Sequence, residues 1–194
     1  MTTLDPKTAF LHVIDAHRWL AASGCAWNIA GANAPKETKD QIHQLLPNID
    51  VMIRDCLLVH ARSLINFYNS DGRKTDIFLR HFGITLDPTL AIALARYKNP
   101  IGVHLFHLTA WRDPSYRSSS STLFRPDWNA DAIPIVELIL DALKYVSQQS
   151  TRWELPFQEL YKALIARFQD KSSPWPQNLC GEANVSTYLT KLGL

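Results

Sequence analysis

Apolar residues recur every three or four positions along most of the chain, which is the spacing of an amphipathic helix with one buried face. The longest such run opens at Pro47 and continues to about residue 69. Asp5-Pro6, Asp87-Pro88 and Asn99-Pro100 each place a capping side chain before a proline, a pair typical of a helix start. The pattern predicts helices over about 6–23, 37–46, 47–69, 88–97, 100–111, 130–149 and 156–169. We therefore expect an all-α protein, a bundle of five to seven helices.

The segments between these helices are rich in turn-forming residues. Ser23-Gly24 is expected to end the first helix, before a loop over residues 28–36. Residues 113–129 contain four consecutive serines and predict a mobile loop. We expect residues 1–170 to form a single bundle domain. Residues 171–194, which include Trp175, then form a C-terminal tail that either docks on the bundle or binds a partner.

Composition excludes several classes of protein. A chain of 194 residues with 46% hydrophobic residues can bury a core without disulfides, and its three cysteines lack the spacing of a zinc site or a disulfide framework. The net charge of +2 is too small to indicate a nucleic-acid binder by itself, although it permits a local basic patch. No glycine-rich phosphate loop occurs, and no cofactor is expected. Neither a signal-type segment nor a membrane-length apolar run is present, so we expect a cytoplasmic protein with no membrane contact.

The segment 98–109 gathers a cation, an amide and two histidines around one predicted helix start. Asn99 as the cap would leave free amides for an anion, and Lys98 adds positive charge. His104 and His107, three residues apart, share a helix face and titrate near neutral pH. The segment therefore predicts a site that holds phosphate and moves a proton. In the alternative interpretation Asn99 is a plain cap and His107 packs inside the bundle. Zinc-binding helices space their histidines four apart around a glutamate, so no metal is expected here.

A second candidate pair, Arg54 and His60, lies in the helix that follows Pro47. Arginine can clamp phosphate and histidine can move a proton during phosphodiester cleavage. However, a six-residue step turns the helix by about 240°, so the two side chains do not share a face. His60 also falls on the apolar stripe, which favours a buried ring bonded to a polar neighbour. The remaining histidines before it and after it are expected at the surface or in caps: His12, His17, His43 and His81.

Arginines alternate with aromatic residues in the serine-rich segment. Arg112, Arg117 and Arg125 accompany three aromatic side chains there. Such a combination contacts single-stranded nucleic acid through phosphate pairing and base stacking. These arginines are therefore candidate RNA-binding residues, and the alternative is a merely solvated loop.

Three stretches carry a resemblance to known proteins. They are Leu58-Val59-His60-Ala61-Arg62-Ser63-Leu64-Ile65-Asn66-Phe67, then Asp76-Ile77-Phe78, and finally His107-Leu108-Thr109. They resemble a set of uncharacterised bacterial all-α proteins with a His-Ala-Arg-x-Leu-hydrophobic-x-Phe helix and a later Asn…His-Leu-Thr segment. Over about residues 48–112 the chain is also similar to HEPN domains. Those are helical bundles that, in many toxins and defence proteins, cleave RNA without a metal ion.

The motif of HEPN domains is an arginine, usually followed by a polar residue, then four to six positions and a histidine. Arg54 and His60 fit that spacing, but in an early helix rather than the usual late one. Lys98 and His104 fit the position better, with lysine in place of arginine, which removes the planar fork that grips phosphate. With the alignment anchored on His-Leu-Thr, His107 is the equivalent histidine and Arg96 or Lys98 its cation, although the gap from Arg96 to His107 is too long for the motif.

The resemblance implies a metal-independent endoribonuclease, or a degenerate relative that binds RNA, acting as a homodimer in a toxin–antitoxin or defence system. It implies these roles: general acid/base for His104 or His107, charge stabilisation for Lys98 with Arg54 or Arg112, and phosphate orientation for Asn99. The alternative is a non-catalytic helical protein, such as an immunity, regulatory or scaffolding subunit, that binds a protein partner through its tail. The modest net charge and the lysine at position 98 favour that alternative.

Overall fold

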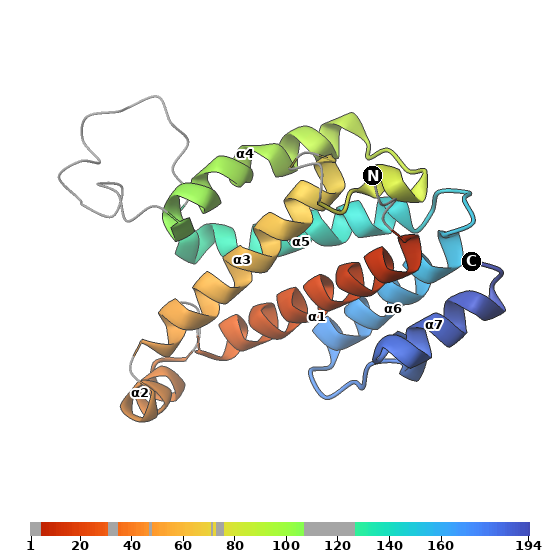
Figure 1. Ribbon diagram of the computed structural model, residues 1–194. Coiled ribbons are helices and arrows are strands. Elements are labelled where there is room, and N and C mark those ends of the chain that lie inside the picture. The colour runs from red at the N-terminus through yellow and green to blue at the C-terminus, as the bar shows by residue number, and fades with distance from the viewer. Residues whose placement is uncertain (1–4, 31–34, 47, 71, 73–75, 107–126) are drawn as a thin grey trace.

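The computed structural model describes residues 5–30, 35–46, 48–70, 72, 76–106 and 127–194 (Figure 1). Within these ranges every regular element is helical, which confirms the predicted all-α class. The α-helices are α1 (Pro6–Ala30), α2 (Lys36–Leu45), α3 (Ile49–Asn69), α4 (Pro88–Phe106), α5 (Trp128–Val146), α6 (Glu154–Gln169) and α7 (Glu182–Lys191). Two 3-10 turns, η1 (Leu79–Phe82) and η4 (Gln177–Leu179), complete the order.

The helices pack as a bundle around one core. Figure 1 shows α1 lying between α3 and α6, with α5 behind them, and α4 lying along α3 and α5. Helix α7 packs on α1 at the edge of the bundle. Helix α2 projects beyond the ends of α1 and α3 and has no buried residue (Figure 1). The helix α3 therefore occupies a central place, in contact with α1, α4 and α5.

A cluster of aromatic rings holds one end of the bundle together. The ring of Phe82, in η1, lies 4.9 Å from Trp153 and 5.5 Å from Phe157, with the planes nearly perpendicular. Phe10 of α1 and Phe67 of α3 approach the same ring at 6.2 and 6.0 Å. Edge-to-face contacts of this kind add to the gain from burying the rings. The cluster joins α1, α3, η1 and α6.

Two predicted helix starts are confirmed by their capping bonds. Oδ1 of Asp5 accepts the amide of Lys7 at 3.2 Å, and Oδ2 accepts the amide of Thr8 at 3.3 Å. At the start of α4, Oδ1 of Asp87 accepts the amide of Thr89 at 2.9 Å. In each case the carboxylate satisfies amides that have no partner within the helix.

The expected helix end at Ser23-Gly24 is wrong, because α1 continues to Ala30. With 25 residues α1 is longer than α3, which has 21. Gly24 serves instead as a contact point, since a Cβ atom there would lie 3.2 Å from the ring of Phe168 on α6. Trp27, one turn further on, is 2% exposed. Burial of this last part of the helix outweighs the low helix propensity of glycine, which is about 1 kcal/mol.

The expected helix start at Asn99-Pro100 is also wrong. A single helix, α4, runs from Pro88 to Phe106 with Pro100 inside it. Proline lacks an amide hydrogen and so removes one helical hydrogen bond. Leu94, Tyr97 and Ile101 are all buried on the side of α4 that faces the bundle, so packing holds the helix across the proline.

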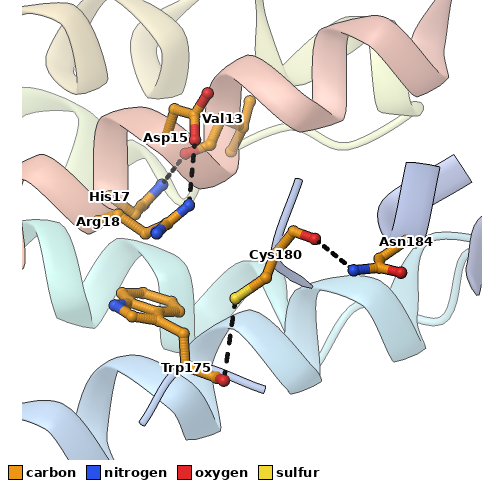
Figure 2. A network of polar contacts seen from close by, with 7 residues as sticks. All are labelled: Val13, Asp15, His17, Arg18, Trp175, Cys180 and Asn184. Carbon is orange, nitrogen blue, oxygen red and sulfur yellow. Dashed lines mark hydrogen bonds and ion pairs between the residues drawn. The ribbon is translucent and has the colours of Figure 1, made fainter. Parts of the chain in front are cut away.

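The C-terminal segment packs against the bundle. Leu179 and Leu189 are fully buried and belong to the same core as the other helices. Trp175 is half-buried, and the guanidinium carbon of Arg18 lies 5.6 Å from its ring centre. Figure 2 shows the Trp175 side chain next to Arg18 of α1. It also shows the hydrogen bond, 2.8 Å long, that the Asn184 side chain donates to the Cys180 carbonyl oxygen. No helix in the described ranges is long and apolar enough to cross a bilayer.

Candidate functional site

The helix α4 carries the predicted residues Lys98, Asn99 and His104. Lys98 is half-buried and Asn99 is exposed, and both lie well inside the helix. Because amides in a helix interior bond to carbonyls of the preceding turn, the free amides expected at Asn99 are not available for an anion. His104 lies in the last turns of α4. The other predicted side chains on this part of the chain lie outside the described residues: His107, Arg112, Arg117 and Arg125.

Arg54 and His60 do not come together on α3. Nε of Arg54 lies 3.3 Å from Oδ1 of Asp55, so its charge is already paired. His60 is half-buried rather than buried as expected, and its ring stacks on the exposed Trp19 of α1, with centres 5.9 Å apart and planes 10° apart. Partial burial lowers the pKa of His60. The two residues therefore belong to different surroundings, as the six-residue step predicts.

A cation that the sequence analysis had given no role, Arg62, reaches α4 instead. Its guanidinium lies directly on the backbone of Gly102, where a Cβ atom would overlap Nη1 and would lie 2.7 Å from Cζ. Only glycine allows this close approach. Lys98 precedes Gly102 by four residues, so it lies one turn away on the same side of α4. The seam between α3 and α4 thus holds two half-buried cations, Arg62 of α3 and Lys98 of α4, and α4 also carries His104.

A buried polar network joins α1 to α3 beneath the surface. His17 is fully buried, and its Nδ1 lies 2.7 Å from the Val13 carbonyl oxygen while its Nε2 lies 2.8 Å from the Tyr68 hydroxyl. A carbonyl can only accept, so Nδ1 carries the proton and Nε2 accepts from Tyr68. Burial lowers the pKa of His17 to about 4, so the ring is neutral at pH 7. The expectation of a surface or capping role for His17 is wrong, whereas His81 does cap, because its Nδ1 accepts the amide of Phe78 at 3.2 Å.

A pocket of about 450 Å³ opens between α1, α3 and the segment before η1. Apolar side chains line it, among them Val13 and Phe67. Four polar residues also line it: His12, Ser63, Asn66 and Asp76. No pattern in the sequence pointed to this pocket, because its walls come from three separate segments.

Comparison of the chain with protein-family models, curated proteins and solved structures gives no match. Within the described part of the chain, no three histidine, cysteine, aspartate or glutamate side chains gather closely enough to hold a metal ion. The function therefore has to be inferred from the residues and their arrangement.

Proposed function

We propose that the protein binds RNA at the seam between α3 and α4 and cleaves it without a metal ion, as HEPN domains do. The observation that carries this proposal is the contact of the Arg62 guanidinium with the α4 backbone at Gly102. The motif of the resembled domains pairs an arginine with a histidine four to six positions later, and α4 has Lys98 at that spacing before His104, with Arg96 further away. Arg62, supplied by the neighbouring helix, fills that role in place of Arg54.

Each group then has a defined chemical task. The planar fork of Arg62 binds two phosphate oxygens at once, and Lys98 adds a point charge that stabilises the phosphorane. His104 or His107 moves the proton between the ribose hydroxyl and the leaving oxygen. Asn99, exposed on the same helix, orients the phosphate. In HEPN domains two such motifs face each other, so the active species is a homodimer.

The test is cleavage of total RNA by the purified protein in EDTA. We expect cleavage by the wild type and a loss of roughly 10²-fold in rate for Arg62→Lys, which keeps the charge but not the fork. Arg152→Lys, at an exposed site between α5 and α6, is the matched control and should cleave normally. Thermal unfolding of each variant separates lost chemistry from lost folding. The proposal is wrong if the wild type does not cleave, or if His104→Ala and His107→Ala both cleave at the normal rate.

One observation favours the second candidate, a non-catalytic protein that binds a protein partner. The α1–α3 surface exposes large apolar side chains, with Trp19 57% and Met52 65% exposed. Such groups at a surface often mark an interface. A stoichiometric partner retained by the wild type, lost by Trp19→Ser and kept by Ile92→Ser on α4, would support this function; Ile92 is similarly exposed, at 74%. Equal recovery with both variants would argue against it.

A further inference from the structure

The pocket between α1, α3 and the segment before η1 has the size and the lining of a small-molecule site. Its volume of about 450 Å³ falls in the range of pockets that hold small organic molecules. More than half of its lining side chains are apolar: Val13, Ala16, Leu64, Phe67 and Ile77. Ala16 and Ile77 are half-buried, so they keep accessible surface, and the other three lie almost fully buried behind it. The pocket can therefore cover the apolar part of a ligand.

Asn66 supplies a hydrogen-bond donor to this pocket. Its side chain is half-buried, and all of the accessible polar surface belongs to the amide nitrogen Nδ2, because Oδ1 is completely buried. No acceptor of the described residues bonds to Nδ2. The neighbouring Ser63 hydroxyl is already committed as a donor to the Val59 carbonyl oxygen at 3.1 Å. Because an amide N–H can only donate, Asn66 selects a ligand that carries an acceptor, such as a carbonyl oxygen.

The lining offers little to a charged ligand. Neither lysine nor arginine occurs among the lining residues that the structure describes. Asp76 is the one carboxylate there, and it is already engaged: its Oδ2 lies against the backbone of Gly72, where a Cβ atom would overlap it. A charged group would also lose hydration next to the apolar side chains, and that loss opposes binding unless a counter-charge offsets it. The lining therefore favours an uncharged molecule.

Hydrogen bonds hold the two helices that form the pocket in place. Val13, which lines the pocket, accepts a bond through its carbonyl oxygen from the buried ring of His17, and the Tyr68 hydroxyl of α3 donates to the same ring (Figure 2 shows the Val13–His17 bond). These bonds tie α1 to α3 next to the pocket. A preformed wall reduces the ordering that a ligand has to impose, which favours binding.

We infer that this pocket binds an uncharged small organic molecule, whose carbonyl oxygen accepts a hydrogen bond from Nδ2 of Asn66 and whose apolar body contacts Ala16 and Ile77. Its residues differ from those of the proposed RNA-binding seam, so the two proposals are tested separately.

Four probes of nearly the same shape test the inference by calorimetry and ligand-observed NMR. They are acetophenone, which has a carbonyl, ethylbenzene, which has no polar group, 1-phenylethylamine, which is cationic, and benzoate, which is anionic. The titrations are run at pH 8, where an ordinary histidine is uncharged, so that the result does not depend on protonation of His12. We expect saturable binding of acetophenone and ethylbenzene, and binding of each charged probe at least roughly 10-fold weaker than that of acetophenone.

Variants then assign the binding to these residues. Asn66→Leu removes the donor and should weaken acetophenone binding by roughly 3- to 10-fold, the contribution of one neutral hydrogen bond, without weakening the binding of ethylbenzene. Ala16→Leu fills the pocket from α1 and should abolish binding of both probes. Ala22→Leu, the same substitution at an exposed site of α1, is the matched control and should bind normally.

The inference is overturned by any of three results. These are no saturable binding of acetophenone to the wild type, binding of either charged probe as tight as that of acetophenone, and equal effects of Asn66→Leu on acetophenone and ethylbenzene. Circular dichroism of each variant verifies that it is folded. Asn66→Leu also removes an unpaired buried acceptor and is expected to fold at least as well as the wild type, so it decides the question even where Ala16→Leu does not fold.

Discussion

The buried ring of His17 makes the stability of this protein depend on pH. Its pKa is about 4 in the folded state, against 6.5 for an unperturbed histidine, because burial disfavours the charged ring. Between these two values the unfolded chain binds a proton that the folded protein does not. The free energy of unfolding is therefore highest above pH 6.5 and falls as the pH is lowered toward 4.

The size of this effect follows from the same two values. Each unit of pKa difference corresponds to about 1.4 kcal/mol, so His17 alone should cost the folded state roughly 3 kcal/mol between pH 7 and pH 4. Full burial of the ring means that solvent screening does not reduce this figure. A loss of that size is a substantial part of the stability of a typical domain.

A double variant isolates the contribution of this residue. His17→Leu combined with Tyr68→Phe removes both polar partners, which should leave the stability at pH 7 nearly unchanged and remove this part of the pH dependence. Tyr68→Phe alone leaves Nε2 of His17 without a donor and should lose about 1–3 kcal/mol at pH 7. Other groups titrate equally in wild type and variant, so the difference between the two reports on His17.

The assay is urea unfolding followed by circular dichroism at several pH values between 7 and 4. The wild type should lose roughly 3 kcal/mol more than the double variant over this range. Equal slopes of stability against pH for the two proteins would refute the reasoning, because they would mean that the buried ring takes up its proton as readily as the unfolded chain does.

Three further changes test the packing and the caps. Asp87→Ala should lower the free energy of unfolding by about 1 kcal/mol through the lost cap of α4, whereas Asp87→Asn, which still accepts the amides, should lose much less in urea titrations. Phe82→Ala should lose about 3–5 kcal/mol in the same assay, since its ring touches four other aromatic residues, and a loss below 1 kcal/mol would contradict the packing described for η1. Gly102→Ala should leave the melting temperature unchanged or raise it, because alanine favours a helix by about 1 kcal/mol and the guanidinium of Arg62, the far end of a flexible side chain, can move away from the new methyl group; a fall in melting temperature would show that the contact of Arg62 with α4 stabilises the fold.

Local signals along the chain were sufficient to predict most of the fold. The apolar period of 3.6 residues and the capping carboxylates Asp5 and Asp87 mark helices because both act within a few residues of each other. Gly83, with a φ of 73°, ends η1 as its lack of a side chain predicts. The same local rules failed at Gly24 and Pro100, where helices continue through residues that normally stop them.

The sequence by itself thus determined the helical class and the approximate position of most helices, and it supplied the candidate residues for proton transfer and phosphate binding. The tertiary structure alone decided which of those residues lie together. It brought Arg62 onto α4 at Gly102, separated Arg54 from His60, buried His17 against Tyr68 and formed the pocket around Asn66. The physical reason is the distance along the chain over which each kind of interaction acts. Helix propensity and capping depend on neighbours within about one turn, whereas burial and helix–helix packing depend on contacts between segments far apart in the chain. These contacts outweigh local preferences of about 1 kcal/mol at a glycine and about 3 kcal/mol at a proline.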